Sequence, residues 1–247
     1  MSGSTIHPRK PFVLLSTRPE NVAAAAELVS FREKMGLGPD GIVQIRLEAR
    51  ELGRLDLRDF SGVILGGSPF NASDPVKSPL QMRVEADLAR MMDEVLDRDF
   101  PLFGACYGVG TVGTAIGARI DDTYSEKPKV IEVSLVREDP LLEGMPQSFH
   151  TMVGHKEAVA VLPDVATVLA TGQDCPTQMF RVQDNIYATQ FHPSAPPPSS
   201  SSACASTHTP DTTNPTNSTR SSPVPAASTS ASPPASGWRR TCRRMRR

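Results

Sequence analysis

Pro101-Leu102-Phe103-Gly104-Ala105-Cys106-Tyr107-Gly108 is the stretch of sequence that decides the fold of this chain. It is a short apolar run that ends at a cysteine held between two glycines. Glycine lacks the Cβ atom that would clash where a strand turns sharply into a helix, so this spacing predicts such a turn, with Cys106 exposed at its tip. The small residues at 109–116 predict a helix packed closely on a sheet. The N-terminus of that helix would point at the sulfur and favour the thiolate.

The residues before this turn alternate between strand-like and helix-like segments. Short apolar runs predict buried strands at 12–15, 42–47 and 62–65. Helices are predicted from Pro19 through an alanine-rich segment to Met35, and from Pro79 to Leu96. Such alternation indicates a mostly parallel sheet with helices on both faces. We therefore expect an α/β domain of the flavodoxin-like kind.

The pattern becomes rich in strands after the turn helix. Strand-like runs are found at 130–136, 149–153, 167–170, 178–182 and 186–190. The last two flank Gln183-Asp184-Asn185, which indicates a β-hairpin. The ordered pattern then stops within Gln190-Phe191-His192-Pro193.

Composition divides the 247-residue chain at residue 194. More than half of the residues in 194–247 are Ser, Thr or Pro, which cannot build a packed apolar face. We therefore expect a folded domain over 8–193 and a disordered tail over 194–247. The net charge of −1 hides the same division, because the tail holds seven Arg and a single acidic residue. Its basic end, 238–247, is expected to be a solvated terminus without a specific nucleic-acid function.

Cysteine usage predicts a cytoplasmic protein. The four cysteines, Cys106, Cys175, Cys204 and Cys242, show no paired spacing, and no apolar run near the N-terminus resembles a signal peptide. No segment is apolar over a length that could cross a bilayer, so no membrane contact is expected. His150 and His155 lack convincing partners for a metal site, and we expect neither a metal nor another cofactor.

Four motifs together point to a known family. They are Gly66-Gly67 at a strand end, Gly104-Ala105-Cys106-Tyr107-Gly108, Gly154-His155-Lys156-Glu157 and Gln190-Phe191-His192-Pro193. In order and approximate spacing they resemble the class I glutamine amidotransferases over nearly all of residues 12–193. The resemblance is greatest to stand-alone proteins related to the amidotransferase domain of GMP synthase.

The resemblance implies a cysteine enzyme that hydrolyses the side-chain amide of glutamine. Cys106 would attack as the thiolate, and His192 would hold the proton and later give it to departing ammonia. The backbone amide of Gly67, which follows Gly66, and the backbone amide of Tyr107 would stabilise the oxyanion of the tetrahedral intermediates. His155 and Glu157 either lie near the substrate or have a structural role.

The resemblance also implies a partner. The chain has no room for an ATP-using synthetase domain, so ammonia would have to pass to a separate synthetase subunit. The substrate would be glutamine or another γ-glutamyl compound.

Two residues depart from the family pattern. The family continues His-Pro-Glu, whereas this chain has Ser194 after Pro193, and serine cannot supply the negative charge that orients the histidine. The family also has a substrate-binding Gln at the position of Gly110. Activity is therefore expected to be impaired. Two alternatives stay open, a γ-glutamyl hydrolase that acts alone and a catalytically silent binding or regulatory protein.

The position of Ser194 predicts that the tail arises from a shifted reading frame. The composition changes at the residue where the family has its glutamate, and not at a domain boundary. Pro, Ser, Thr, Ala and Arg are residues that a GC-rich gene yields when it is read out of frame. We expect the nucleotide sequence to contain a frame that restores Glu after His192-Pro193 and continues with an amphipathic helix. If no alternative frame does so, the tail is genuine.

Overall fold

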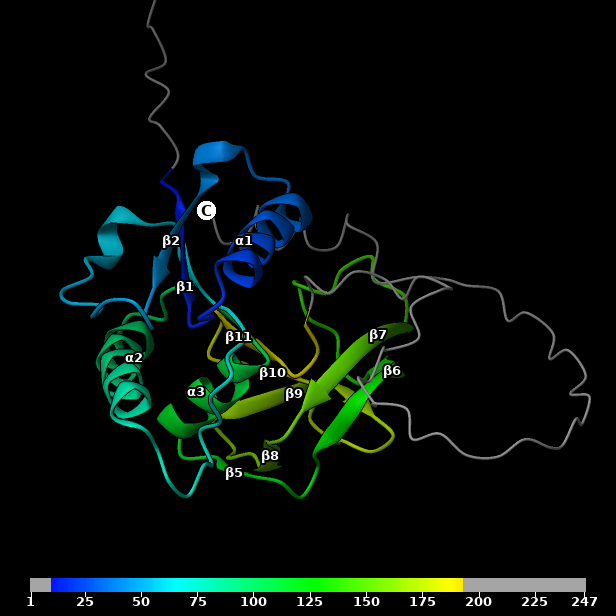
Figure 1. Ribbon diagram of the computed structural model, residues 1–247. Helices are drawn as coiled ribbons and strands as arrows, with labels where there is room; N and C mark the ends of the chain where they lie inside the picture. Colours follow the sequence, from blue (N-terminus) through cyan, green and yellow to red (C-terminus); the bar gives the residue numbers. More distant parts are fainter. Residues whose placement is uncertain (1–9, 193–247) are drawn as a thin grey trace, which may run out of the picture.

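A computed structural model describes residues 10–192 of the chain. The predicted tail over 194–247, with its basic end, Cys204 and Cys242, lies outside the described residues, and so does its boundary with the domain. The first half alternates strands and helices as predicted (Figure 1). Its elements are β1 (Phe12–Ser16), α1 (Asn21–Met35), β2 (Ile42–Arg46), β3 (Gly62–Leu65), α2 (Pro79–Asp97), β4 (Leu102–Ala105) and α3 (Tyr107–Ala115), with short 3-10 helices at Pro39–Gly41 and Leu57–Asp59.

The second half is rich in strands, also as predicted. Its strands are β5 (Arg119–Asp121), β6 (Glu126–Leu135), β7 (Ser148–His155), β8 (Ala158–Val161), β9 (Ala166–Gly172), β10 (Met179–Val182) and β11 (Ile186–Thr189). The sequence did not predict β5 and β8, which pair only with each other in a small antiparallel sheet. Three residues in β5 are too few to give a recognisable alternation of apolar and polar positions.

One large sheet organises the described residues, with the strand order β2-β1-β3-β4-β11-β10-β9-β6-β7. Every pair from β2 to β11 is parallel, and every pair from β11 to β7 is antiparallel. The predicted hairpin is confirmed, since Val182 of β10 faces Ile186 of β11. The chain therefore has the expected α/β fold, with a parallel region that carries the helices and an antiparallel extension.

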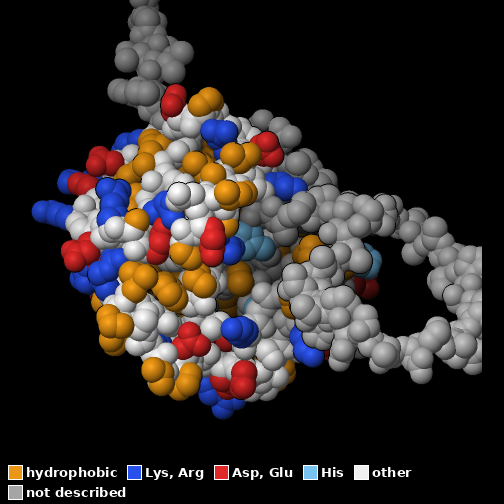
Figure 2. All heavy atoms as spheres, in the orientation of Figure 1, with side chains coloured by type: hydrophobic (Ala, Val, Ile, Leu, Met, Phe, Trp, Pro, Cys, Tyr) orange, Lys and Arg blue, Asp and Glu red, His pale blue; other side chains and the backbone are white. Residues whose placement is uncertain are grey.

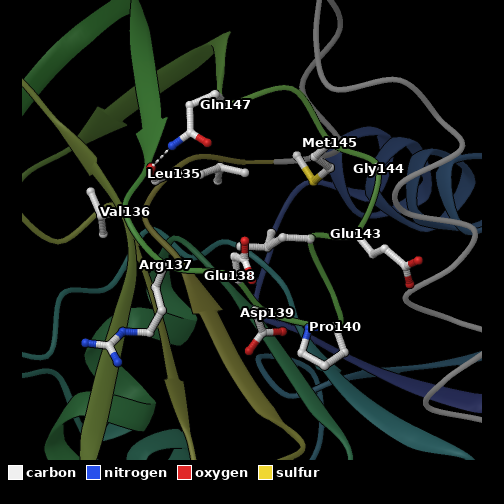
Figure 3. Close-up of a pocket in the computed structure, with 11 residues that line it drawn as sticks. Leu135, Val136, Arg137, Glu138, Asp139, Pro140, Glu143, Gly144, Met145 and Gln147 are labelled. Atoms are coloured by element: carbon white, nitrogen blue, oxygen red, sulfur yellow. Dashed lines mark hydrogen bonds between the residues drawn. The ribbon is translucent and has the colours of Figure 1, made fainter.

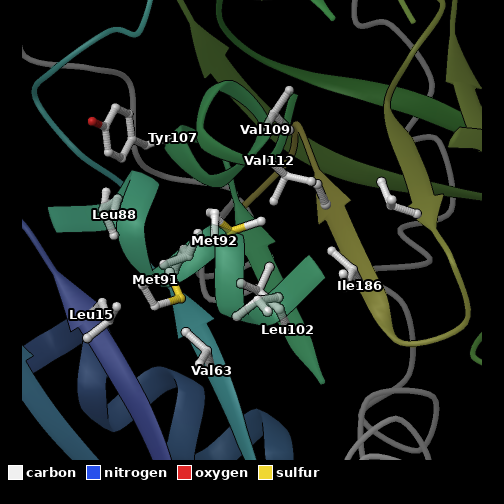
Figure 4. Packing of buried hydrophobic residues seen from close by; sticks show 14 of the residues in the cluster. Leu15, Val63, Leu88, Met91, Met92, Leu102, Tyr107, Val109, Val112 and Ile186 are labelled. Atoms are coloured by element: carbon white, nitrogen blue, oxygen red, sulfur yellow. The ribbon is translucent and has the colours of Figure 1, made fainter. Parts of the chain in front are cut away.

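Helices cover both faces of the parallel region. Phe12 and Leu14 of β1 join a core cluster with Phe31 of α1, whereas the alternate residues Val13 and Leu15 join a second cluster with α2 and α3. Figure 4 shows part of this second cluster, where Met91 and Met92 lie against the strands. Because successive side chains of a strand point to opposite faces, one buried strand can pack both layers.

The pairing of β4 with β11 joins the two halves of the sheet. The register places Thr189 beside Ala105, and the backbone N–H of Cys106 donates to the Thr189 carbonyl at 2.8 Å. His192 follows three residues after the end of β11. Two segments far apart in the sequence therefore end side by side.

The surface of the described residues is mixed in charge on the face that Figure 2 shows. Lys and Arg side chains there lie among Asp and Glu side chains and do not gather by sign. Among the described residues, no helix combines the length and the apolarity needed to span a membrane.

The contact between β4 and α3 yields a stability prediction. A Cβ atom on Gly104 would come within 3.0 Å of the Gly108 Cα and 3.1 Å of its carbonyl oxygen, which are backbone atoms that cannot rotate away. We expect Gly104→Ala to lower the free energy of unfolding by about 1–3 kcal/mol, measured by urea unfolding. Gly38→Ala is the control, because nothing lies within 4 Å of its Cβ position. Equal midpoints for the two variants would contradict this packing argument.

Candidate active site

Cys106 occupies the strained turn that the sequence predicts. It is the N-cap of α3, with φ 55° and ψ −93°, a region that residues with a Cβ atom rarely adopt. The turn is possible because Gly104 and Gly108 approach each other without side chains. Cys106 is half-buried. The turn thus holds its thiol at the carboxyl end of β4.

The thiol opens into a cavity of about 430 Å³, a volume ordinary for a small-molecule site. His192 lines the same cavity, and so do Arg18 and Glu27. Arg18 follows β1, Cys106 follows β4 and His192 follows β11, so three parallel strands contribute residues from their carboxyl ends. This is the edge where open α/β sheets place their ligands. The structure therefore brings the predicted pair, Cys106 and His192, to one site.

The thiol of Cys106 is not poised as a thiolate in this arrangement. Burial raises its pKa, and the negative charges of Glu157 and Glu27 act in the same direction. The Arg18 guanidinium and the backbone N–H of Tyr107 lower it, but do not outweigh burial. The sequence led us to expect that the helix N-terminus would favour the thiolate. Burial has the larger effect here.

Gly66 and Gly67 follow β3, and Gly67 lies beside His192. A Cβ atom on Gly67 would be 3.1 Å from His192 Nε2. The backbone N–H of Gly67 donates to Glu27 Oε1 at 3.0 Å, so this N–H is occupied by a carboxylate in the structure. Its role as an oxyanion donor stays a prediction and requires Glu27 to release it. The backbone N–H of Tyr107, the other predicted donor, lies at the Cys106 sulfur.

His155 lies apart from this cavity, in a buried polar cluster. Its Nε2 is 3.0 Å from Glu126 Oε2, which also accepts from Gln178 Nε2 at 2.6 Å, and its Nδ1 is 2.9 Å from the Glu157 carbonyl oxygen. His155 is not among the residues that line the Cys106 cavity. The geometry favours the structural alternative for His155.

The same cluster is the place where the described residues come nearest to a metal site. Ligand atoms of Glu126, His155 and Cys175 lie within 4.8 Å of one another. The imidazole and the carboxylate already bind each other, and burial raises the pKa of the Cys175 thiol to about 11, whereas a metal binds the thiolate. The hydrogen bonds of the cluster account for its geometry.

Glu157 occupies the space next to Gly110. Its carboxylate accepts from the backbone N–H groups of Ala72 at 2.8 Å and Ser73 at 2.7 Å. A Cβ atom on Gly110 would be 2.7 Å from Glu157 Oε1. A side chain at position 110 would therefore displace the carboxylate that holds this loop, which gives a physical reason for glycine there.

A larger cavity, of about 670 Å³, lies in the connection between β6 and β7 (Figure 3). Asp139 is its buried carboxylate, and it accepts from the Leu141 N–H at 2.8 Å and from the Tyr187 hydroxyl at 3.1 Å. Arg181 also pairs with Asp139 at 3.1 Å. Neither a Cys nor a His lines this cavity. Its acidic group stabilises the connection between β6 and β7.

Sequence reasoning missed Arg18 and Glu27 as site residues. Arg18 could have been found, because it follows a predicted strand whose carboxyl end lies at the ligand edge of the sheet. Glu27 gives no such signal, because it is one of several acidic residues in a helical segment. Only the packing of α1 turns it inward.

Residues 41–203 match the family described as glutamine amidotransferase class-I. This match covers more than half of the chain, and the chain belongs to that family. The turn at Cys106 and the sheet order provide the structural setting for this assignment.

Individual relatives agree with the family assignment. One subunit of the glutamine-hydrolyzing GMP synthase of Methanosphaera stadtmanae is 28% identical over 133 residues, which are 53% of this chain and 64% of that protein. The GMP synthase of Thermosipho melanesiensis is 30% identical over 136 residues, 54% of this chain and 24% of that protein. The aligned part thus spans less than two thirds of either relative.

A glutamine amidotransferase from Thermotoga maritima has a similar crystal structure. Its TM-score is 0.61 at 19% identity, over 76% of this chain and 77% of that chain. At this identity the likeness shows the fold.

The two described cysteines should differ in reactivity. With substoichiometric iodoacetamide on the native protein, we expect Cys106 to be alkylated before Cys175, because Cys106 opens into a cavity and Cys175 is fully buried. Because burial raises the pKa of Cys106, the rate should keep rising with pH above about 9.5, one unit above the ordinary thiol pKa, where an ordinary thiol levels off. Peptide mapping by mass spectrometry measures both rates. Denatured protein, in which the two sites should react alike, is the control, and equal rates in native protein would contradict the assignment.

Proposed function

We propose that this chain hydrolyses the side-chain amide of glutamine through a thioester on Cys106 and supplies the ammonia to a separate acceptor enzyme. The observation that carries the proposal is the strained turn that holds Cys106 in one cavity with His192. Membership of the class I glutamine amidotransferase family supports the same chemistry.

The reaction would begin with transfer of the Cys106 proton to His192. The sulfur then attacks the amide carbon, and an oxyanion forms that the Tyr107 N–H, and Gly67 N–H once it is released, would stabilise. The protonated His192 gives its proton to the amide nitrogen, the C–N bond breaks and ammonia leaves. Water, deprotonated by His192, then attacks the thioester carbon, and the C–S bond breaks to give glutamate and the free thiol.

The acceptor of ammonia would be another polypeptide. Among the relatives, the protein from Methanosphaera stadtmanae is named as one subunit of a GMP synthase, which supports a partner in the form of a separate synthetase subunit. The free thiols of Cys106 and Cys175 are compatible with the reducing cytoplasm that the cysteine usage predicts.

A catalytically silent binding protein is the second candidate. Three observations favour it, namely the occupation of the Gly67 N–H by Glu27, the raised pKa of Cys106, and Ser194 in place of the family's glutamate. Each of them lowers the expected rate, and none of them removes the cavity. A γ-glutamyl hydrolase that acts alone would use the same two residues on a different substrate.

A glutaminase assay tests the proposal. We expect the purified chain to release glutamate and ammonia from glutamine, and Cys106→Ala to reduce this release to background, because no other described residue in the cavity is a thiol. Cys175→Ala is the matched control and should retain activity, since Cys175 lies in a different cluster.

The same assay separates the alternatives. Release of glutamate from a γ-glutamyl peptide but not from glutamine would favour the γ-glutamyl hydrolase. No release from either substrate, together with saturable binding of glutamine, would favour the silent binding protein.

A further inference from the structure

Glu27 is a buried carboxylate on the inner face of α1. The buried residues of this helix are Ala24, Glu27, Phe31 and Met35, so Glu27 occupies a position where the helical spacing would place an apolar side chain. Its side chain is only 3% exposed. Burial of an ionised carboxylate is costly unless the group is paired and hydrogen-bonded, so its partners indicate its role.

The partners of Glu27 come from the ends of three strands. Oε2 accepts at 3.0 Å from the hydroxyl of Ser16, the last residue of β1. Oε1 accepts from the Gly67 N–H at 3.0 Å and from Arg18 Nε at 3.3 Å. His192 Nε2 lies 3.5 Å from the same oxygen. The carboxylate therefore lies between the first strand, the Gly-Gly segment and the predicted catalytic histidine.

The backbone around Glu27 leaves room for the carboxylate. A Cβ atom on Gly66 would be 2.5 Å from Glu27 Oε2 and 2.7 Å from its Oε1, so only glycine admits the carboxylate in this place. This requirement gives the Gly-Gly segment a structural function besides the predicted oxyanion contact.

The charge of Glu27 is stabilised by its surroundings. Burial raises the pKa of this carboxyl group, but the neighbouring His192 imidazole, with smaller contributions from Arg18 and the Gly67 N–H, more than compensates, so that the pKa lies below its usual value. Glu27 is thus ionised at neutral pH. A fixed negative charge 3.5 Å from His192 Nε2 holds the imidazole in one orientation.

We infer that Glu27 is the positioning carboxylate of His192, supplied by helix α1 in a chain that has Ser194 where its family has a glutamate. It acts through His192 and does not touch the substrate. The inference rests on the proposed function, since it assigns His192 the role of proton carrier. Glu27 would then supply the negative charge that Ser194 cannot. The sequence predicts that loss of this charge impairs the enzyme.

The contact between Glu27 and Gly67 suggests the opposite effect. A carboxylate that occupies an oxyanion donor would inhibit the reaction, and its removal would then increase the rate. The two effects differ in the sign of the change in kcat, so one substitution distinguishes them.

Glu27→Gln is the variant that tests the inference, because it keeps the shape and an accepting oxygen and removes the charge. We expect kcat for glutamine to fall on the order of 10²-fold, with KM changed less than about threefold, because the charge acts on the proton carrier and not on the substrate. Ser16→Ala is the matched control, since it removes the hydrogen bond to Oε2 and leaves the charge. Its kcat should stay within about twofold of the unsubstituted chain.

Three kinetic results would overturn the inference. An unchanged kcat in Glu27→Gln would mean that the charge does not act on the reaction. A raised kcat would mark Glu27 as an inhibitor that occupies the Gly67 donor. Equal losses in Glu27→Gln and Ser16→Ala would mean that Glu27 only stabilises the fold.

A second measurement needs neither activity nor a folded Glu27→Gln variant. In the full chain labelled with ¹³C at glutamate carboxyls, the signal assigned to Glu27 should titrate below its usual pKa, and His192→Gln should raise that pKa, because the neighbouring His192 helps to lower it. An unchanged Glu27 pKa in His192→Gln would overturn the coupling. If the chain releases no ammonia, the proposed function fails, and this titration alone decides whether Glu27 and His192 are coupled.

Discussion

The parallel pairing of β4 with β11 is the interaction on which the rest of the structure depends. Its register places Thr189 beside Ala105, and the hydrogen bond from the Cys106 N–H to the Thr189 carbonyl extends the ladder by one step beyond β4. Cys106 can therefore adopt its strained backbone without losing a backbone partner. The same pairing carries the chain to His192 at the same sheet edge. One strand pair thus supports both the geometry of the thiol and the approach of the imidazole.

The environment of the thiol is a balance of opposite charges. Arg18 lines the same cavity as Cys106 and Glu27, and its charge lowers the pKa of both the thiol and the carboxyl group. The charge of Glu157 raises the pKa of the Cys106 thiol, while its carboxylate fixes the loop at Ala72 and Ser73. A binding event that changed the position of either acid would change the reactivity of the sulfur. The cavity is therefore electrostatically adjustable rather than permanently activated.

The sequence predicted the parts of this structure that depend on local pattern. The strands at 12–15 and 62–65, the helix that begins at Pro79, the turn at Cys106 and the hairpin at Gln183-Asp184-Asn185 were all found at or within a few residues of their places. Each combines an apolar run with a residue of special backbone geometry, and both signals are local. The family resemblance, carried by such motifs, was confirmed by the match over 41–203.

Pairwise chemistry between distant segments could not be predicted. Nothing in the sequence near Glu27 indicates that its carboxylate meets Gly67 and His192, because the contact depends on how α1 packs on the sheet. For the same reason, the sequence could not show that the effect of burial on the pKa of Cys106 is larger than the effect of the helix N-terminus. The position of β11 inside the sheet has a further consequence for biosynthesis. A ribosome makes β11 after every other described strand, yet it must insert between β4 and β10. Until then β4 and β10 each have an unpaired edge, so the nascent chain passes through a stage that is open to intermolecular strand pairing.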